Sequence, residues 1–226
     1  MNKLKYLAPI LIAVACFGLQ QVKADMFSFD LNVGNTPSPP GIGSFPGPYA
    51  HVVVNQTDAT HATITFTSLT NNGNIYLMGA QGAVAVNVVG SGIASSPATA
   101  SNSGTGFTPG AVTFAGAGNE DGFGSFNVTY DSFDGYTHSS DMISFTLTST
   151  SGGWADAAHV LFANATNNLA AAHIFVAISP ADAGVAALAT GYAAGNGSSV
   201  PDGGATVMLL GAGLSALGIV RRYLKS

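Results

Sequence analysis

Ile143-Ser144-Phe145-Thr146-Leu147-Thr148 alternates large apolar side chains with small hydroxyl-bearing ones at every position. A period of two residues places alternate side chains on opposite faces of a β-strand, so the apolar residues face a core and the others face water. Threonine suits the outer face because its β-branched side chain favours the pleated backbone. This stretch therefore predicts a half-buried strand.

The same kind of pattern recurs along the chain on both sides of this stretch. Residues 62–67 and 126–130 alternate in the same way and predict two more half-buried strands. Less regular apolar runs predict strands that are more fully buried, and they occupy residues 51–54, 75–78, 83–89, 159–163 and 173–178.

The segments between these runs have the composition of loops. Residues 34–48 hold five of the ten prolines, which cannot donate the hydrogen bonds of a β-ladder. Residues 91–110 have no apolar periodicity, and residues 116–124 hold four glycines. Residues 181–194 fit either an Ala-rich helix interrupted by glycines or a loop followed by a final strand at 190–193. Short strands joined by Gly-rich loops predict an all-β fold, either an antiparallel β-sandwich or a jelly roll.

The charges are segregated along the chain. All six basic residues lie near the two ends, with none between Lys23 and Arg221, whereas all eleven acidic residues lie between those two positions. The long middle segment therefore has a formal charge of −11, against −5 for the whole chain. Because a body without Lys or Arg cannot neutralise phosphates, nucleic-acid binding is excluded as a function class.

The first 24 residues have the three parts of a secretory signal peptide. Lys3 and Lys5 precede an apolar run at residues 6–19, which is too short to span a membrane comfortably, and Ala24 ends a stretch suited to cleavage by signal peptidase before Asp25. Cys16 is the only cysteine and lies in this run, so the mature body has no disulfide. Lipidation of Cys16 is an alternative, although the residues before it lack the usual leucine.

The C-terminal segment, residues 200–226, has similar parts in the opposite order: a polar motif, an apolar run and a basic tail. Val200-Pro201-Asp202-Gly203-Gly204 is a polar turn, residues 205–220 are free of charge, and Arg221, Arg222 and Lys225 form a basic tail. A helix over residues 205–220 would be about 24 Å long, close to the hydrocarbon thickness of a membrane. The basic tail would stay in the cytoplasm by the positive-inside rule, which leaves the acidic body outside.

This three-part order resembles a PEP-CTERM protein-sorting domain, and Val200-Pro201-Asp202-Gly203-Gly204 resembles its VPDGG variant. The resemblance implies recognition and removal of the segment by an exosortase, a membrane transpeptidase, with the motif residues as substrate rather than catalyst. A second resemblance, to the β-rich ectodomains common among such proteins, rests on Ser151-Gly152-Gly153-Trp154 and on residues 160–161, 170–174 and 190–192. The implied organisation is a signal peptide at 1–24, an extracellular domain at 25–199 and a sorting domain at 200–226.

Acidic residues are the main candidates for a binding site in the body. Asp131, Asp134 and Asp141, with Glu120 and Asp121 nearby in the sequence, offer the hard oxygen ligands that calcium prefers. Their spacing is not that of an EF-hand, and the alternative is that Asp131 and Asp134 belong to the turn of a hairpin between the strands at 126–130 and 143–148. No other cofactor is indicated.

Other candidate chemistry is weaker. The five histidines form no metal-binding pair of the H-x-x-x-H or H-E-x-x-H type, and the chain has no G-x-S-x-G nucleophile motif, so no enzymatic activity is expected. Trp154, the only tryptophan, fits core packing at the start of a strand or, alternatively, stacking on a sugar ring from a loop.

The functional expectation follows from the ends of the chain and the resemblance. We expect an exported precursor, anchored in the membrane and then sorted to the outer surface or the extracellular matrix, with a structural or adhesive role linked to exopolysaccharide or biofilm matrix. The alternatives are a carbohydrate- or calcium-binding β-sandwich module and, less favoured, a secreted hydrolase.

Overall fold

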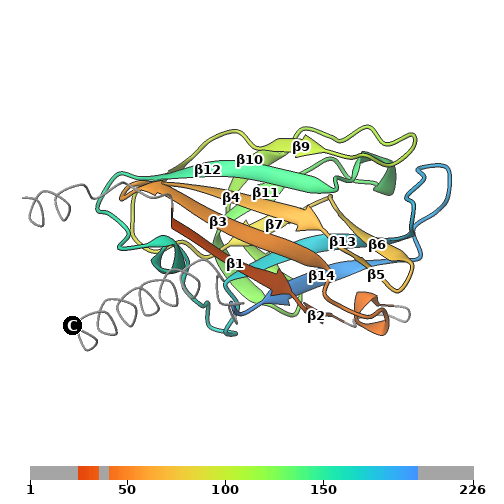
Figure 1. The fold of residues 1–226 in the computed structure, drawn as a ribbon, viewed down its shortest axis with the longest axis horizontal. Coiled ribbons are helices and arrows are strands. Elements are labelled where there is room, and N and C mark those ends of the chain that lie inside the picture. The colour runs from red at the N-terminus through yellow and green to blue at the C-terminus, as the bar shows by residue number, and fades with distance from the viewer. Residues whose placement is uncertain (1–24, 36–40, 198–226) are drawn as a thin grey trace, which may run out of the picture.

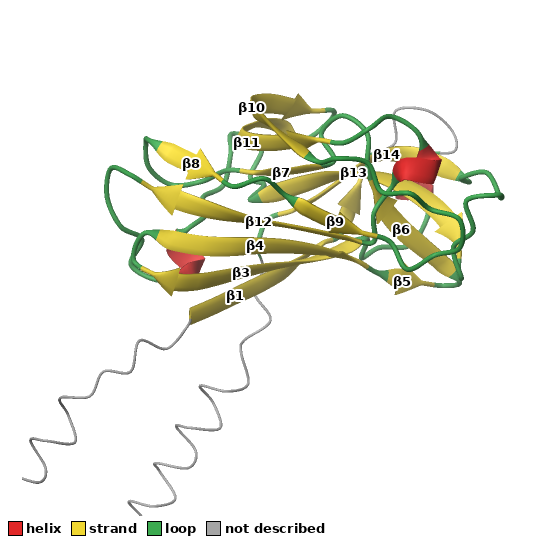
Figure 2. Cartoon of the chain, turned by 90° about the horizontal axis from the view of Figure 1, so that it is seen from above, coloured by secondary structure: helices red, strands yellow, loops and turns green. Residues whose placement is uncertain are grey.

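The structure, a computed structural model, describes residues 25–35 and 41–197. Two antiparallel β-sheets pack face to face (Figures 1 and 2). Most large apolar side chains are buried between them. Three single-turn 3-10 helices, η1 (Ile42–Ser44), η2 (Tyr136–His138) and η3 (Ala157–His159), are the only helices among the described residues. The predicted all-β, sandwich-like fold is confirmed.

The first sheet contains the strand predicted from the alternation at residues 143–148. Its strands are ordered β1-β3-β4-β12, and the short strands β8 and β9 both pair with the far side of β12. The bounds are β1 (Asp25–Leu31), β3 (Ala50–Asp58), β4 (His61–Ser68), β8 (Ile93–Ser95), β9 (Thr99–Ser101) and β12 (Met142–Ser149). We call this layer sheet A.

The second sheet is larger and carries the candidate site described below. Its order is β10-β11-β7-β13-β14-β2, with β6 pairing β13 and β5 pairing β6. The bounds are β2 (Val33–Gly34), β5 (Thr70–Asn71), β6 (Asn74–Met78), β7 (Val84–Val86), β10 (Thr113–Glu120), β11 (Gly124–Asp131), β13 (Ala170–Ile178) and β14 (Ala189–Gly195). We call this layer sheet B.

Strand β12 has the two faces that its sequence predicts. Ile143, Phe145 and Leu147 are buried between the sheets. On the opposite face the hydroxyl of Ser144 lies 2.9 Å from that of Thr65 on β4, and Thr146 and Thr63 form a similar pair at 3.2 Å. Hydroxyl pairs across neighbouring strands support the sheet while leaving its outer face polar.

Tyr130 of β11 joins the two sheets. Its side chain is fully buried, and its ring centroid lies 4.4 Å from that of Phe145 in sheet A. Its hydroxyl donates to the carbonyl of Ser96 at 2.7 Å and also bonds the hydroxyl of Ser95, at the end of β8. One side chain thus combines apolar contact across the core with hydrogen bonds to the edge of sheet A.

Several predicted loops are strands in the structure. Residues 116–124 form the end of β10, a tight turn in which Gly122 adopts a φ of +83°, and the start of β11. Gly116 adopts a φ of +85° within β10, at a bulge where the strand register shifts. Residues 91–110 contain the short strands β8 and β9. Of the two alternatives for residues 181–194, the loop followed by a final strand is confirmed as β14.

Two other predictions are wrong. Residues 159–163 do not form a strand: they follow η3, and only an isolated bridge links Leu161 to Val88. Strands β11 and β12 do not form a hairpin, because β11 belongs to sheet B and β12 to sheet A. The segment that contains Asp134 therefore crosses from one layer of the sandwich to the other.

The first and last strands of the described chain meet. A Cβ on Gly195 of β14 would lie 2.3 Å from the carbonyl oxygen of Asp30 in β1, so only glycine fits there. Two residues later, a Cβ on Gly197 would meet Leu169 and would lie 3.3 Å from the ring of Phe27, nearer the start of β1. The chain therefore enters and leaves the described domain beside the same strand.

Candidate functional site

The three aspartates proposed as calcium ligands are not brought together. Asp141 is engaged by the loop after β9, where its carboxylate accepts hydrogen bonds from the Ser103 amide at 2.7 Å and hydroxyl at 2.6 Å, and from Ser101. Asp131 and Asp134, in contrast, line one pocket. Across residues 25–35 and 41–197, no group of three or more Asp, Glu, His or Cys side chains is arranged to hold a metal ion.

Asp131 lies where two adjoining pockets meet on sheet B. One pocket, of about 430 Å³, extends toward Asp134 and His173, and the other, of about 250 Å³, extends toward Glu120. Both are lined by Asp131, Tyr192 and the backbone turn at Gln81. We call the combined feature the acidic groove and define it by Gln81, Glu120, Asp131, Asp134, His173 and Tyr192.

Gly82, between β6 and β7, makes this arrangement possible. Its backbone has a φ of +65°, and its amide donates a hydrogen bond to Asp131 at 2.8 Å. A Cβ at this position would lie 2.1 Å from a carboxylate oxygen of Glu120. Glycine therefore satisfies the backbone conformation and leaves the space that the Glu120 carboxylate occupies.

Glu120, the last residue of β10, is the most unusual side chain of the groove. It is only 2% exposed, yet no described residue donates a hydrogen bond to its carboxylate, which lines the smaller pocket. Burial, and then the nearby negative charge of Asp131, raise the pKa of Glu120 from its usual 4.5 to about 7. The groove therefore contains a buried acid that has no hydrogen-bond donor among residues 25–35 and 41–197.

The opposite wall is aromatic. His173 of β13 donates a hydrogen bond from Nδ1 to the carbonyl of Gly79 at 2.8 Å, and its Nε2 accepts one from the Thr190 hydroxyl at 3.0 Å. Burial lowers the pKa of His173. The Tyr192 ring lies 4.8 Å from the His173 ring, and its hydroxyl donates to the Gln81 carbonyl at 3.1 Å.

The charge on this wall is set by its surroundings. Burial, followed by the nearby carboxylates, raises the pKa of Tyr192 to about 12, so its phenol is neutral at physiological pH. Since His173 is also neutral there, the groove has only negative formal charge. Its chemistry favours ligands that donate hydrogen bonds or carry positive charge.

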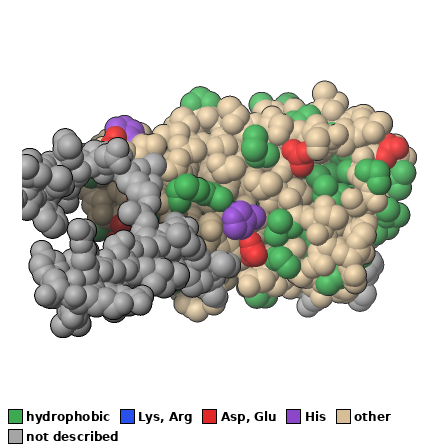
Figure 3. Space-filling model, viewed as in Figure 1, with side chains coloured by type: hydrophobic (Ala, Val, Ile, Leu, Met, Phe, Trp, Pro, Cys, Tyr) green, Lys and Arg blue, Asp and Glu red, His purple; other side chains and the backbone are tan. Residues whose placement is uncertain are grey.

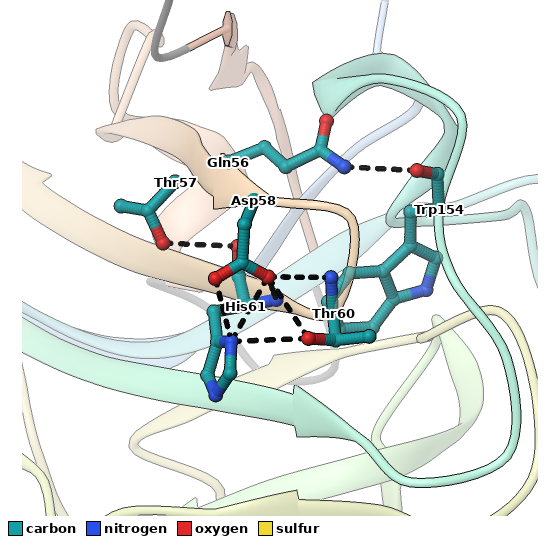
Figure 4. A network of polar contacts seen from close by, with 6 residues as sticks. All are labelled: Gln56, Thr57, Asp58, Thr60, His61 and Trp154. Atoms are coloured by element: carbon teal, nitrogen blue, oxygen red, sulfur yellow. Dashed lines mark hydrogen bonds and ion pairs between the residues drawn. The ribbon is translucent and has the colours of Figure 1, made fainter. Parts of the chain in front are cut away.

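A second acidic pocket, around Trp154, is structural (Figure 4). Asp58 accepts hydrogen bonds from the amides of Thr60 and His61 and from both side chains, which lower its pKa and close the turn between β3 and β4. Trp154 is buried and its indole donates to the Val89 carbonyl at 3.0 Å. Core packing of Trp154 is therefore confirmed, although on a loop rather than at the start of a strand.

The surface agrees with the charge segregation seen in the sequence. On the face that Figure 3 shows, scattered acidic and histidine side chains lie among apolar and uncharged polar ones, and the described residues include no Lys or Arg. In residues 25–35 and 41–197 no helix is both long and apolar enough to cross a membrane. The predicted cleavage site at Ala24, the motif at 200–204, the apolar segment at 205–220 and the basic tail lie outside the described residues.

Comparison with known proteins bears on the C-terminus alone. Residues 199–224 match a family model described as the VPDSG-CTERM motif, whose fourth position is Gly203 in this chain. No curated protein and no solved structure matches the chain.

The chain thus carries a PEP-CTERM-like sorting signal, as predicted, although the match does not distinguish the VPDGG variant. Such a motif implies processing by an exosortase-like enzyme and indicates an exported, cell-surface protein, here with a β-sandwich domain.

Proposed function

We propose that this protein is a non-enzymatic surface adhesin whose domain, residues 25–199, binds extracellular polysaccharide after removal of the signal peptide and the sorting segment. The observation that carries the proposal is the combination of a sorting signal at 199–224 with an open groove that joins carboxylates to an aromatic wall. Binding sites of this kind use a few placed polar groups for orientation and an aromatic ring for contact area.

The absence of a positive charge in the groove supports this choice of ligand. Polysaccharides present many hydroxyl donors, and the groove offers carboxylate oxygens of Glu120 and Asp131 to accept them. The bases that would bind phosphate or sulfate esters are missing, because the domain has no Lys or Arg.

The Thr190–His173 contact favours a second candidate, a secreted hydrolase. A hydroxyl donating to a histidine at 3.0 Å has the distance of a nucleophile and its base. However, Thr190 and His173 lie on paired strands, where such contacts are common, and the other nitrogen of His173 bonds a backbone carbonyl rather than a carboxylate. We therefore treat the contact as structural.

Processing at both ends is the first expected result. Protein recovered from the surface fraction of the native host should begin at Asp25 and lack everything beyond the motif at 200–204. Both cuts together would remove all six basic residues. Intact mass measurement checks this, and a mature surface protein that retains Arg221 and Arg222 would contradict exosortase processing and indicate a simple membrane anchor.

Saturable binding to the host's own exopolysaccharide is the second expected result. The mature protein should co-sediment with the purified polymer, and the size distribution of the polymer should stay unchanged on long incubation. Failure to co-sediment would contradict an adhesive role. Shortening of the polymer that disappears in Thr190→Ala would instead establish the hydrolase.

A further inference from the structure

The starting point is the unpartnered carboxyl of Glu120. A buried ionised carboxylate is costly unless it is paired or hydrogen-bonded, and proteins normally supply a donor for it. Here the described domain contains no Lys or Arg that could do so, and no described residue donates to Glu120. The carboxylate instead lines an open pocket, so a donor on a bound ligand can reach it.

We propose that the acidic groove binds the primary ammonium group of an amino sugar, as carried by a de-N-acetylated hexosamine unit of a polysaccharide. The proposal rests on the function proposed above and names the chemistry of the ligand.

The acceptors in the groove match an ammonium group. An ammonium has three donors and no acceptor, so it needs several oxygen atoms on one side of it. Glu120 offers both carboxylate oxygens, and Asp131 offers the oxygen that the Gly82 amide does not engage. Both carboxylates lie against Gly82, whose amide donates to Asp131 at 2.8 Å and where a Cβ would lie 2.1 Å from a Glu120 oxygen, so one cation beside Gly82 can interact with both.

The rest of the groove suits a sugar ring. The neutral ring of Tyr192 lines both pockets, where it can contact the apolar face of a sugar and attract the adjacent cation. The larger pocket continues past Asp131 toward Asp134 and His173, so a neighbouring sugar unit can lie along it. The groove therefore accommodates more of a chain than a single ammonium group.

Calcium fits the same groove less well. It takes six to eight oxygen ligands, and carboxylates usually supply several of them. The smaller pocket contains only the carboxylates of Glu120 and Asp131, and no described site gathers three acidic or histidine side chains around one point. Two carboxylates are enough for an ammonium group, which needs only three acceptors.

The test is a calorimetric titration of the mature protein with glucosamine oligomers and with N-acetylglucosamine oligomers of equal length. At neutral pH we expect saturable binding of the glucosamine oligomer, at least about tenfold weaker binding of the acetylated one, and loss of the difference in Glu120→Gln. At a mildly acidic pH, where the amine is already protonated, ammonium binding should also release protons, because it favours ionised Glu120, and this release should appear as a dependence of the heat on the buffer.

The matched control is Asp156→Asn, which also removes one negative charge. Asp156 lies in the pocket around Trp154 and caps η3, and asparagine is an equally good cap. This variant should bind the glucosamine oligomer within about twofold of the unchanged protein, because one distant charge is largely screened. Asp131→Asn provides a second groove variant, so that the test does not depend on one substitution, and circular dichroism checks that each variant folds.

The outcomes separate this proposal from the adhesive function. Equal binding of both oligomers, unaffected by Glu120→Gln, would overturn the ammonium site while leaving polysaccharide binding intact. If titration with calcium gives a saturable heat that Glu120→Gln abolishes, the ligand of the groove is a metal ion rather than an amino sugar. If oligolysine binds as tightly as the glucosamine oligomer does, the site is not specific for a sugar. If the mature protein binds neither oligomer and also fails to bind the host polymer, the adhesive function itself is wrong.

Discussion

Replacing Tyr130 with alanine should lower the free energy of unfolding by about 3 to 5 kcal/mol, the usual range for removing a large aromatic side chain from a core. Tyr130 is fully buried and its ring packs on Phe145 across the interface between the sheets. The substitution also leaves the carbonyl of Ser96 without its donor. Denaturant unfolding followed by tryptophan fluorescence measures the change, since Trp154 is the only tryptophan.

Two companion variants separate the components of this loss. Tyr130→Phe keeps the ring and removes only the hydroxyl, so it should cost about 1 to 2 kcal/mol. Ser144→Ala, on the outer face of β12, should cost less than about 1 kcal/mol. A Tyr130→Ala protein as stable as Ser144→Ala would mean that the two sheets do not pack through Tyr130.

Glu120→Gln should stabilise the protein at pH 8 by up to about 3 kcal/mol, while leaving its stability at pH 4 nearly unchanged. The pKa of Glu120 is raised from 4.5 to about 7 by folding, and each pK unit corresponds to about 1.4 kcal/mol. A raised pKa means that the folded state holds the proton more tightly than the unfolded one. The stabilisation of the folded state by protonated Glu120 is therefore complete below pH 4.5, and it is lost as the pH rises through about 7.

The titratable groups around Glu120 determine how stability depends on pH. The titratable groups that face Glu120 are Asp131 on β11 and Tyr192 on β14, and Tyr192 stays neutral because its own pKa is raised to about 12. Thermal unfolding from pH 4 to 9 should show a falling stability in the unchanged protein that is reduced in Glu120→Gln. Parallel curves for the two proteins would mean that Glu120 has the same pKa in the folded and unfolded states, which would contradict its burial without a donor.

Local patterns predict much of this fold. The alternation at Ile143, Phe145 and Leu147 is sufficient to identify β12 and its inner face, because burial on one side of a sheet is a property of consecutive residues. The same reasoning does not show which strands pair. Strands β11 and β12 are neighbours in sequence, yet they lie in different sheets, and the layer that a strand joins depends on contacts across the whole chain.

The candidate site shows the same limit more strongly. The sequence draws attention to Glu120 and Asp131 as acidic residues near one another, but the burial of Glu120 depends on Gly82 and Tyr192, which come from distant parts of the chain. Likewise, the sequence groups Asp141 with Asp131, whereas hydrogen bonds from Ser101 and Ser103 engage it elsewhere. Nothing in the spacing of these residues distinguishes the buried acid from the exposed ones.

The absence of Lys and Arg from the domain also affects how long it can persist outside the cell. Trypsin-like proteases select a basic side chain at the bond they cut, through an acidic specificity pocket. Residues 25–197 contain no such side chain, not even in the long segment at 91–110 that carries the short edge strands β8 and β9. Exposed loops are where proteases usually nick a folded protein. The domain therefore offers this class of protease no bond to cut, whether it is folded or unfolded.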